Sequence, residues 1–392
     1  MTLLGAKAWH FLNSKWTAGA IALAVFCIAM ATIAMLSAIR SPRLDAGFPS
    51  AASDADLRSL RKAYSGPPAT WPQPQLLADA RFTEMGSLTL HAPSAGKARL
   101  LARLGSELFE DPRLSASGHV ACQSCHNRRL GWGDALPTPF GHGRAKGKRN
   151  AQSLFSVGYK SSFFWDGRSN SLEDQALGPL TDHSEMANHD ISALLTRINA
   201  VDRYRSSFAE VTGKDTIDLD ALTSALAAFQ RTLDRRTRFD RFADGETRVM
   251  TDVEIWGLHL FRSKAKCANC HSGPTLSDGR FHNLGLSFFN RTLEDLGRYG
   301  VTGAPSDTGR FLTPSLRHIS KTGPYMHNGI FPSLSGLIRF YEAGGGRIRA
   351  DLHVNSERKA LLDAAVKKSP QLEGFELTPS ERAALLAFLN TL

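Results

Sequence analysis

The stretch "ACQSCH" at residues 121–126 returns as "AKCANCH" at residues 265–271, so the chain contains the pattern C-x-x-C-H twice. The two copies lie 145 positions apart and hold four of the five cysteines. The fifth, Cys27, lies in an apolar run near the N-terminus, which leaves no cysteines for a disulfide framework between distant segments. A pattern that occurs twice predicts two related units.

In C-x-x-C-H the two thiols can add to the vinyl groups of a haem, and the adjacent histidine then becomes the proximal iron ligand. Zinc sites and thioredoxin-like redox pairs are the alternatives for C-x-x-C. Zinc is disfavoured because the motifs lie far apart and each has its own histidine, and a redox pair because no βαβ pattern surrounds them. We expect two covalently bound haem c groups, held by Cys122, Cys125 and His126 and by Cys267, Cys270 and His271.

The residues before each motif repeat as well: "LGSELF" at 104–109 and "WGLHLF" at 256–261 each precede a basic loop and C-x-x-C-H. Leucines at helical spacing predict a helix from about residue 96, and others predict one over 217–234. Capping boxes mark helix starts at Thr251 with Glu254 and at Thr378 with Glu381. Alternating strand patterns are nearly absent.

We therefore predict a mostly α fold with two cytochrome c-like haem domains packed face to face, at 96–245 and 246–392. The irregular segments 127–170 and 272–325 are long for plain loops, and we expect them to line sites.

The run at 17–39 is 23 residues long and carries no charge, which is enough for one membrane-spanning helix. It predicts an anchor or uncleaved signal after a cytoplasmic segment 1–16, with a cleaved signal peptide as the alternative. Residues 40–95 are rich in Pro, Ala and Ser and predict a tether with one short helix. Each interpretation places the remaining chain in the periplasm, most simply anchored to the inner membrane.

The formal net charge is +10, and 42% of the residues are hydrophobic. No nucleic-acid recognition motif accompanies the positive charge, so nucleic acid is not an expected partner. Haem propionates would offset part of the charge, and an acidic redox partner or an anionic membrane surface would explain the rest.

From about Gly96 to its end the chain resembles the bacterial diheme cytochrome c peroxidase and MauG superfamily. The stretches that carry the resemblance are "LFEDPRLS", "CQSCHN", "GHGRAKGKRNAQSL", "FFWDGRSNSLEDQALGPL", "SEM", "FRSKAKCANCHSGP", "TPSLRHISKTGPYMHNG" and "FYEAGG". The resemblance implies reduction of hydrogen peroxide to water with electrons from a c-type cytochrome, a cupredoxin or a quinol. A homodimer is a further candidate assembly, although the sequence does not reveal the oligomeric state.

Four catalytic residues follow from the resemblance, namely His142, Trp165, Gln175 and Glu185. His142 in "GHG" matches a distal histidine on a mobile loop above the first haem, and Trp165 matches an aromatic bridge between the haems. Gln175 and Glu185 match two polar residues of the peroxide pocket, where a carboxylate can transfer a proton between the peroxide oxygens. Without the resemblance, His142, Gln175 and Glu185 are ordinary surface residues and Trp165 is core.

The second haem departs from the usual peroxidase pattern. Fourteen residues beyond His327, where typical peroxidases place a methionine ligand, this chain has Tyr341, as in the MauG-type branch. A phenolate is an anionic ligand that lowers the potential of the iron, and Met326 is the competing candidate. His142 favours the reductively activated peroxidases and Tyr341 argues against an easily reduced second haem, so neither family mechanism transfers whole.

Asn150, Thr322 and Pro324 match a calcium site of the family, an amide oxygen with two backbone carbonyls. Hydrogen bonding without a metal is the alternative. For the whole chain, a MauG-like enzyme that oxidises a protein partner and a non-enzymatic diheme electron-transfer cytochrome remain alternatives to the peroxidase.

Overall fold

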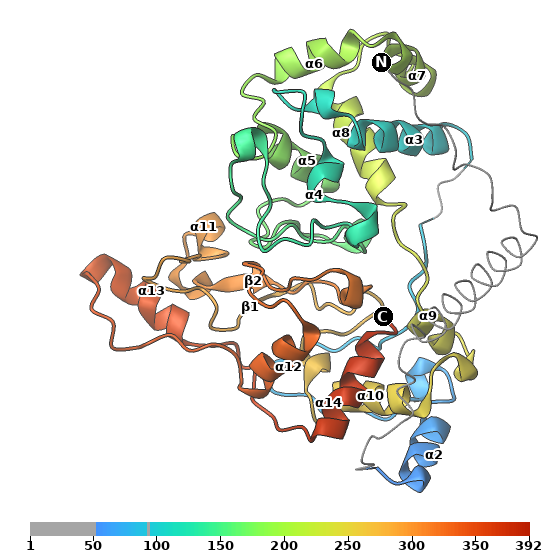
Figure 1. Cartoon of the computed structure of the whole chain (residues 1–392), viewed down its shortest axis with the longest axis vertical. Helices are drawn as coiled ribbons and strands as arrows, with labels where there is room; N and C mark the ends of the chain where they lie inside the picture. The colour runs from blue at the N-terminus through green and yellow to red at the C-terminus, as the bar shows by residue number, and fades with distance from the viewer. Residues whose placement is uncertain (1–51, 92–94) are drawn as a thin grey trace, which may run out of the picture. The chain divides into compact units, whose positions relative to one another are not determined.

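The computed structural model describes residues 52–91 and 95–392 (Figure 1). The predicted anchor at 17–39 and the segment before it lie outside the described residues. Within the described ranges, no helix combines the length and the apolar composition that crossing a bilayer requires.

The regular structure of the described residues is mostly helical, as the sequence predicts (Figure 1). The helices are α2 (Asp54–Ala63), α3 (Lys97–Phe109), α4 (Cys122–Cys125), α5 (Leu172–Thr181), α6 (Ile191–Asn199), α7 (Asp202–Thr212), α8 (Leu219–Gln230), α9 (Arg238–Ala243), α10 (Asp252–Arg262), α11 (Tyr299–Thr302), α12 (Leu334–Glu342), α13 (Ser356–Val366) and α14 (Pro379–Leu389). Two short strands, β1 (Phe281–Asn283) and β2 (Arg310–Leu312), pair antiparallel with His282 opposite Phe311.

The predicted helix starts are confirmed in detail. Thr251 caps α10 and Thr378 caps α14, and in each case the glutamate three residues later completes a capping box. These reciprocal hydrogen bonds satisfy backbone N–H groups that a helix start would otherwise leave without a partner. The helix predicted from residue 96 is α3, whose Leu104 and Leu108 are fully buried.

The duplication seen in the sequence extends to the packing of helices. α3, which precedes the first motif, crosses α8 at Gly105, where an added Cβ would lie 1.8 Å from the Ala225 carbonyl oxygen. α10, which precedes the second motif, crosses α14 at Gly257, where an added Cβ would lie 2.0 Å from the Ala384 oxygen. Each crossing therefore needs glycine at that position.

Two large apolar clusters surround these crossings. The first is built from residues between 104 and 233, and the second from residues between 64 and 85 together with 239–392. By contacts, residues 51–392 form one compact unit. The division into domains at 96–245 and 246–392 therefore stays a prediction.

The described part of the predicted tether differs from a free linker. Helix α2 packs on α10, and Tyr64, Trp71 and Met85 are buried in the second apolar cluster. Burial of these three large apolar side chains contributes to holding this segment in place, and the Pro-rich composition did not reveal them.

Residues 72–88, here called the strap, run across the second C-x-x-C-H motif. Asn269, inside the motif, accepts a hydrogen bond from Leu77 N at 2.6 Å, and Gly273 N donates to Thr83 O at 2.9 Å. The side chain of Arg262 is buried and pairs with Glu84 of the strap. Because these contacts are polar and specific, they fix the register of the strap as well as its position.

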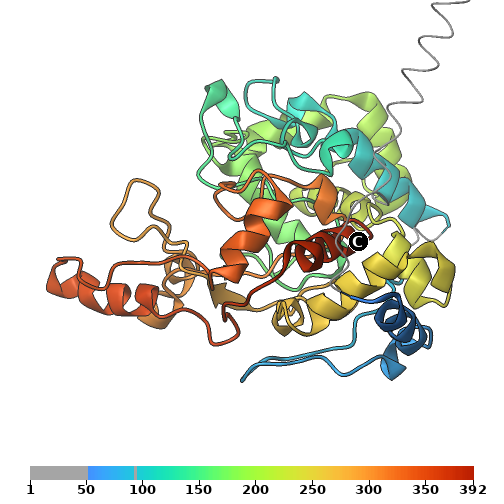
Figure 2. The ribbon, with the colours of Figure 1, turned by 60° about the horizontal axis from the view of Figure 1, so that its bottom comes forward.

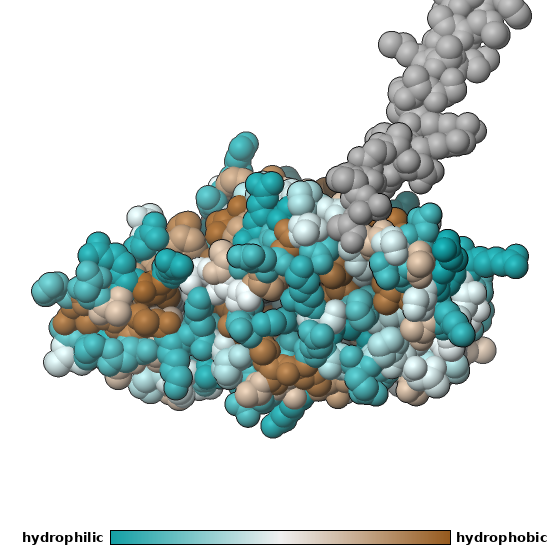
Figure 3. All heavy atoms as spheres, turned by 90° about the horizontal axis from the view of Figure 1, so that it is seen from below, coloured by the Kyte–Doolittle hydropathy of each residue, from teal (hydrophilic) through white to brown (hydrophobic). Residues whose placement is uncertain are grey.

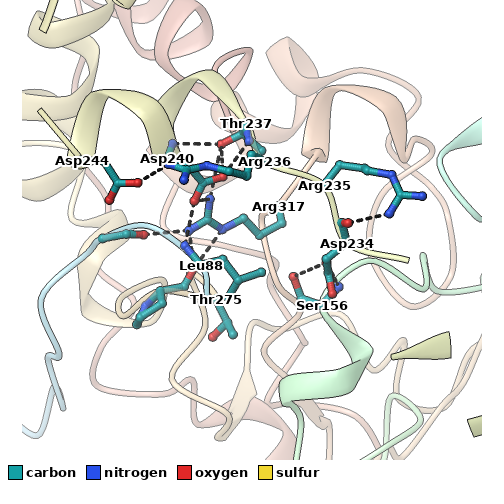
Figure 4. Close-up of polar contacts among 12 residues, drawn as sticks. Leu88, Ser156, Asp234, Arg235, Arg236, Thr237, Asp240, Asp244, Thr275 and Arg317 are labelled. Atoms are coloured by element: carbon teal, nitrogen blue, oxygen red, sulfur yellow. Dashed lines mark hydrogen bonds and ion pairs between the residues drawn. The ribbon is translucent and has the colours of Figure 1, made fainter. Parts of the chain in front are cut away.

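The strap ends at a buried ion pair between Arg317 and Asp240, whose side chains are each 1% exposed (Figure 4). Asp240 accepts from Arg317 at 2.7 Å and from Leu88 N at 2.8 Å, and Arg317 also donates to Gly86 O. A buried ion pair needs such additional hydrogen bonds to offset the loss of hydration. The pair therefore holds the strap against both the α9 region and the chain after β2.

The regions that carry the two motifs contact one another through a charged network. Arg149 donates to both carboxylate oxygens of Asp295, at 2.6 and 2.8 Å, and to Asp166 at 2.5 Å. Arg298 donates to the backbone oxygen of Asp166 at 2.9 Å. Arg149, Asp166 and Asp295 are largely buried, which strengthens their attraction and fixes the first region against the second.

A small lobe around α13 extends at one side of the described unit (Figure 2). It has a separate apolar cluster of Phe289, Leu361, Leu362 and Ala365. In the space-filling view, apolar surface shows within this lobe between hydrophilic residues (Figure 3).

Candidate active site

The first motif forms a short helical turn that presents its histidine to a cavity. His126 N donates to Cys122 O at 3.0 Å, and His126 Nδ1 lies 3.0 Å from Trp132 O. This second contact orients the imidazole and leaves Nε2 free to bind an iron. Burial lowers the pKa of His126, so the ring is neutral, as a metal ligand must be.

The second motif has the same local geometry. His271 N donates to Cys267 O at 2.9 Å, and His271 Nδ1 lies 3.0 Å from Leu276 O. Burial again lowers the pKa of the imidazole. Both motifs adjoin cavities that their cysteines and histidine help to line, so the residues present fit two covalently attached haem groups.

The cavity at the first motif brings together the predicted peroxide residues. Its lining consists of Phe109, Val120, Ala121, Cys122, Cys125, His126, Leu154, Gln175, Ala176, Pro179, Leu180, Glu185, Met186, Leu226 and Gln230. Gln175 and Glu185 are thus the predicted polar side chains that reach this otherwise mainly apolar site. Gln175 lies on α5, and Glu185 follows the end of that helix.

Glu185 has the electrostatic environment of an acid–base group. Burial raises the pKa of its carboxyl, and the nearby Asp182 carboxylate raises the pKa further, while Arg168 lowers it. Two backbone hydrogen bonds fix the position of Glu185 in the chain. Glu185 N donates to Asp182 O at 3.1 Å, and the next residue, Met186, donates from its N to Pro179 O at 3.1 Å. A half-buried carboxyl with a raised pKa is suited to accept and return a proton.

The backbone of His142 contacts the backbone of Glu185, but His142 does not line the first cavity. His142 N donates to Glu185 O at 2.8 Å. The preceding residue packs so closely that a Cβ on Gly141 would lie 2.2 Å from Ser184 O. His142 Nδ1 is buried without a hydrogen-bond partner among the described residues, and the role of His142 as a distal ligand stays a prediction.

The cavity at the second motif is larger and draws its lining from both motif regions. Cys267, Cys270, His271, Met326 and Tyr341 all line it, so both candidate ligands of the second iron face the same space as the motif. Burial raises the pKa of the Tyr341 hydroxyl. The geometry therefore fits Tyr341 as a ligand and does not separate it from Met326.

Trp165 lies in the second cavity and not in the first. Its Nε1 donates to Asn150 O at 3.0 Å, and its own carbonyl accepts from Leu312 N at 2.8 Å. It is a residue of the first motif region that is bonded to both regions and forms part of the wall around the second haem site. Its placement fits a bridge as well as it fits a core residue.

The residues proposed to bind calcium, Asn150, Thr322 and Pro324, also line the second cavity. Asn150 Nδ2 donates to Leu136 O at 2.9 Å, which leaves its side-chain oxygen as the available ligand atom. A site of one amide oxygen and two carbonyls carries no formal charge.

Two histidines near the second motif were not predicted as site residues. His327 is 3% exposed, stacks on Phe311 with ring centroids 3.7 Å apart, and its Nε2 has no partner among the described residues. His282 Nε2 lies 2.7 Å from Asp278 Oδ2, and both side chains are buried. The spacing of four between Asp278 and His282 was the only signal in the sequence, and it is common.

The family model for di-haem cytochrome c peroxidases matches residues 100–248. Cytochrome-c peroxidase IdrP1 of Denitromonas iodatirespirans is 34% identical over 370 residues, which cover 86% of this chain and 93% of that protein. The methylamine utilization protein MauG of Methylorubrum extorquens is 39% identical over 294 residues, covering 74% of this chain and 77% of that protein. The crystal structure of a MauG-like protein associated with microbial copper homeostasis superposes with a TM-score of 0.66 at 31% identity, over 82% of this chain and 93% of that chain.

Proposed function

The chain belongs to the di-haem cytochrome c peroxidase family, and we propose that it reduces hydrogen peroxide to water with electrons from a small redox donor. One peroxide, two protons and two electrons give two molecules of water. The observation that carries this proposal is the first cavity, where Glu185 and Gln175 face the same space as His126 and its two cysteines.

The residues of the first cavity have separate tasks. Haem bound there supplies an iron at which peroxide can bind and through which electrons can pass. The Glu185 carboxylate accepts the proton of one peroxide oxygen and returns it to the other, so that water can leave. The Gln175 amide orients the bound peroxide. The apolar side chains around them exclude bulk water, which strengthens both interactions.

The second haem site would store or deliver the other electron. Trp165 lies in its wall and is hydrogen-bonded to both motif regions, which supports a role in coupling the two centres. Tyr341, as an anionic ligand, would hold the second iron at a low potential. His142 would leave or approach the first iron through movement of its glycine-flanked loop.

Steady peroxide consumption by the holo-protein with a reduced c-type cytochrome, a cupredoxin or a quinol tests this function. Mass spectrometry of the assayed protein must show two haems per chain. An optical spectrum that does not respond to peroxide in either the oxidised or the half-reduced protein would contradict it and would favour a non-enzymatic electron-transfer cytochrome.

A MauG-like enzyme that oxidises a protein partner is the second candidate. Tyr341 in the second cavity favours it, as does the 39% identity to a MauG protein. Such an enzyme would consume little peroxide with generic donors and would form its product only on its own partner, which incubation with peroxide and mass spectrometry of candidate partners can detect.

We also propose a periplasmic location, with residues 17–39 anchoring the chain to the inner membrane, and calcium at Asn150, Thr322 and Pro324. The cysteine motifs and the uncharged N-terminal run support export. Membrane fractionation of full-length and residue-40-start chains tests the anchor. Metal analysis before and after chelation tests calcium, and gel filtration of the holo-protein tests a homodimer.

A further inference from the structure

A basic pocket opens beside the second haem site. Its lining comes from the strap, both strands and the segment before α14, namely Asp79, Ala80, Arg81, Arg280, Phe281, His282, Arg310, Ser369, Pro370 and Gln371. His282, Ser369 and Gln371 also line the second haem cavity, so they form the wall between the two spaces.

The charge of this pocket is strongly unbalanced. Arg81, Arg280 and Arg310 come from three separate segments, and within residues 52–91 and 95–392 none of them forms an ion pair with a carboxylate. Arg280 donates to the backbone oxygen of Asp79 at 3.0 Å, which positions the guanidinium without neutralising it. Among the residues that line the pocket, Asp79 is the one carboxylate, and Asp278, outside the lining, contacts the ring of His282.

The floor of the pocket connects directly to the haem attachment. His282 Nε2 and Asp278 Oδ2 are 2.7 Å apart, and Asp278 N donates to Cys270 O at 2.8 Å. A nitrogen of His282 and a carboxylate oxygen of Asp278 lie within 4.8 Å of Cys270 Sγ, the atom that would form the thioether. A molecule bound to these arginines would therefore be separated by the side chain of His282 from Cys270, which would attach the second haem.

We propose that this pocket is the docking site for an acidic electron-donor protein, whose surface carboxylates pair with Arg81, Arg280 and Arg310. The donor delivers electrons across His282 to the second haem. This inference rests on the proposed function, because that reaction requires a donor. Arginine suits the role because its planar guanidinium pairs with carboxylates through two hydrogen bonds and remains charged at every physiological pH.

Binding is the most direct test, because it does not depend on turnover. The probe is plant plastocyanin, an acidic cupredoxin, titrated into the holo-protein by calorimetry at low salt and at about 0.2 M salt, where exposed charges are screened. The pocket variant is R81Q/R280Q/R310Q. The matched control is R58Q/R99Q/R248Q, which removes three exposed arginines that form no ion pair among the described residues.

The pocket variant is expected to bind plastocyanin at least about tenfold more weakly at low salt and to lose most of the salt dependence, with the control unchanged. Asp79→Asn removes a negative charge from the pocket, so it is expected to tighten the binding of plastocyanin. Damage to the fold would weaken binding and could not produce this gain. Asp79 has a φ of 61°, and asparagine tolerates that conformation. In peroxide turnover, the pocket variant should raise the KM for plastocyanin and leave kcat unchanged.

Equal dissociation constants for the pocket and control variants would overturn the proposal. An equal loss of binding to basic mitochondrial cytochrome c would also overturn it, since removing positive charge should not weaken that pair. A shifted potential of the second haem with unchanged plastocyanin affinity would assign the arginines to the haem propionates instead. Plastocyanin binding can respond as expected while none of the donors tested, not even a small-molecule dye, supports the reduction of peroxide. In that case the docking site stands and the proposed function falls.

Discussion

The two C-x-x-C-H regions are nearly identical where they would hold a haem and unlike on the open side. In both, the histidine Nδ1 lies 3.0 Å from a backbone oxygen, and in both a glycine crossing supports the preceding helix. The first cavity then presents Glu185 and Gln175, whereas the second presents Tyr341, Met326 and a stacked His327. The attachment motif is thus repeated locally, whereas the side chains that distinguish the two cavities come from residues outside the motifs.

A second difference concerns support. The strap and the buried Arg317–Asp240 pair hold the second region, and the basic pocket adjoins that region as well. The first region has the loop of His142 packed on the backbone of Glu185.

The largest expected effect comes from removing the acid–base group of the first region. Glu185→Gln keeps the size of the side chain and eliminates the proton acceptor, so peroxide turnover should fall about 10²–10⁴-fold with both haems attached. Glu210→Gln, on the exposed face of α7, is the matched control and should not change the rate. Wild-type turnover in the Glu185 variant would remove this residue from the mechanism.

Replacing Tyr341 by the methionine of the usual peroxidase pattern should alter the reduction potential of the second haem. In the proposed ligation, Tyr341→Met replaces an anionic ligand with a neutral thioether, and we expect the second haem potential to rise by on the order of 0.1 V, within the roughly 0.8 V that axial ligands span. Redox titration followed by EPR measures this shift. If Met326→Leu shifts the potential and Tyr341→Phe does not, Met326 is the ligand.

The pH dependence should come from the first region. Burial and Asp182 raise the pKa of Glu185, and in the proposed mechanism the carboxylate is the active form. Turnover should therefore fall as the pH drops through this raised pKa, approaching about tenfold per pH unit below it. Asp182→Asn removes the repulsion, so it should move the midpoint to lower pH in a pH–rate profile. An unchanged midpoint would mean that another group controls the rate.

The residues that could be predicted from the sequence are those whose signal is local. The two motifs, the capping boxes at Thr251 and Thr378, and the mostly helical fold needed only neighbouring residues, and the structure has them as predicted. Gln175 and Glu185 were found through resemblance alone, and the structure places both in the first cavity.

The contacts that sequence reasoning missed join residues far apart. Leu77 meets Asn269 across 192 positions, and Arg317 meets Gly86 across 231. A Pro-rich segment has no periodicity to reveal such partners, so the strap was predicted as a tether. The basic pocket was missed for the same reason, because Arg81, Arg280 and Arg310 converge only in the folded chain.

The smallest expected effect tests the strap through equivalent positions of the two motifs. Asn269 is 1% exposed and bonded to Leu77 N, whereas its counterpart Ser124 is exposed and bonded only to Ala121 N at 3.1 Å. Asn269→Ala leaves the part-buried Leu77 N–H without a partner and also removes the hydrogen bond from the Asn269 amide to Lys266 O, which should cost about 1–3 kcal/mol of stability. Ser124→Ala should cost less, because water can replace its contact.

Denaturant unfolding of the two holo-proteins, with limited proteolysis within residues 72–88, measures this difference. The Asn269 variant should lower the unfolding midpoint and expose the strap to cleavage, while the Ser124 variant should do neither. Equal midpoints and equal cleavage in both variants would mean that the strap adds nothing to the second motif. The asymmetry of support between the two regions would then rest on the Arg317–Asp240 pair alone.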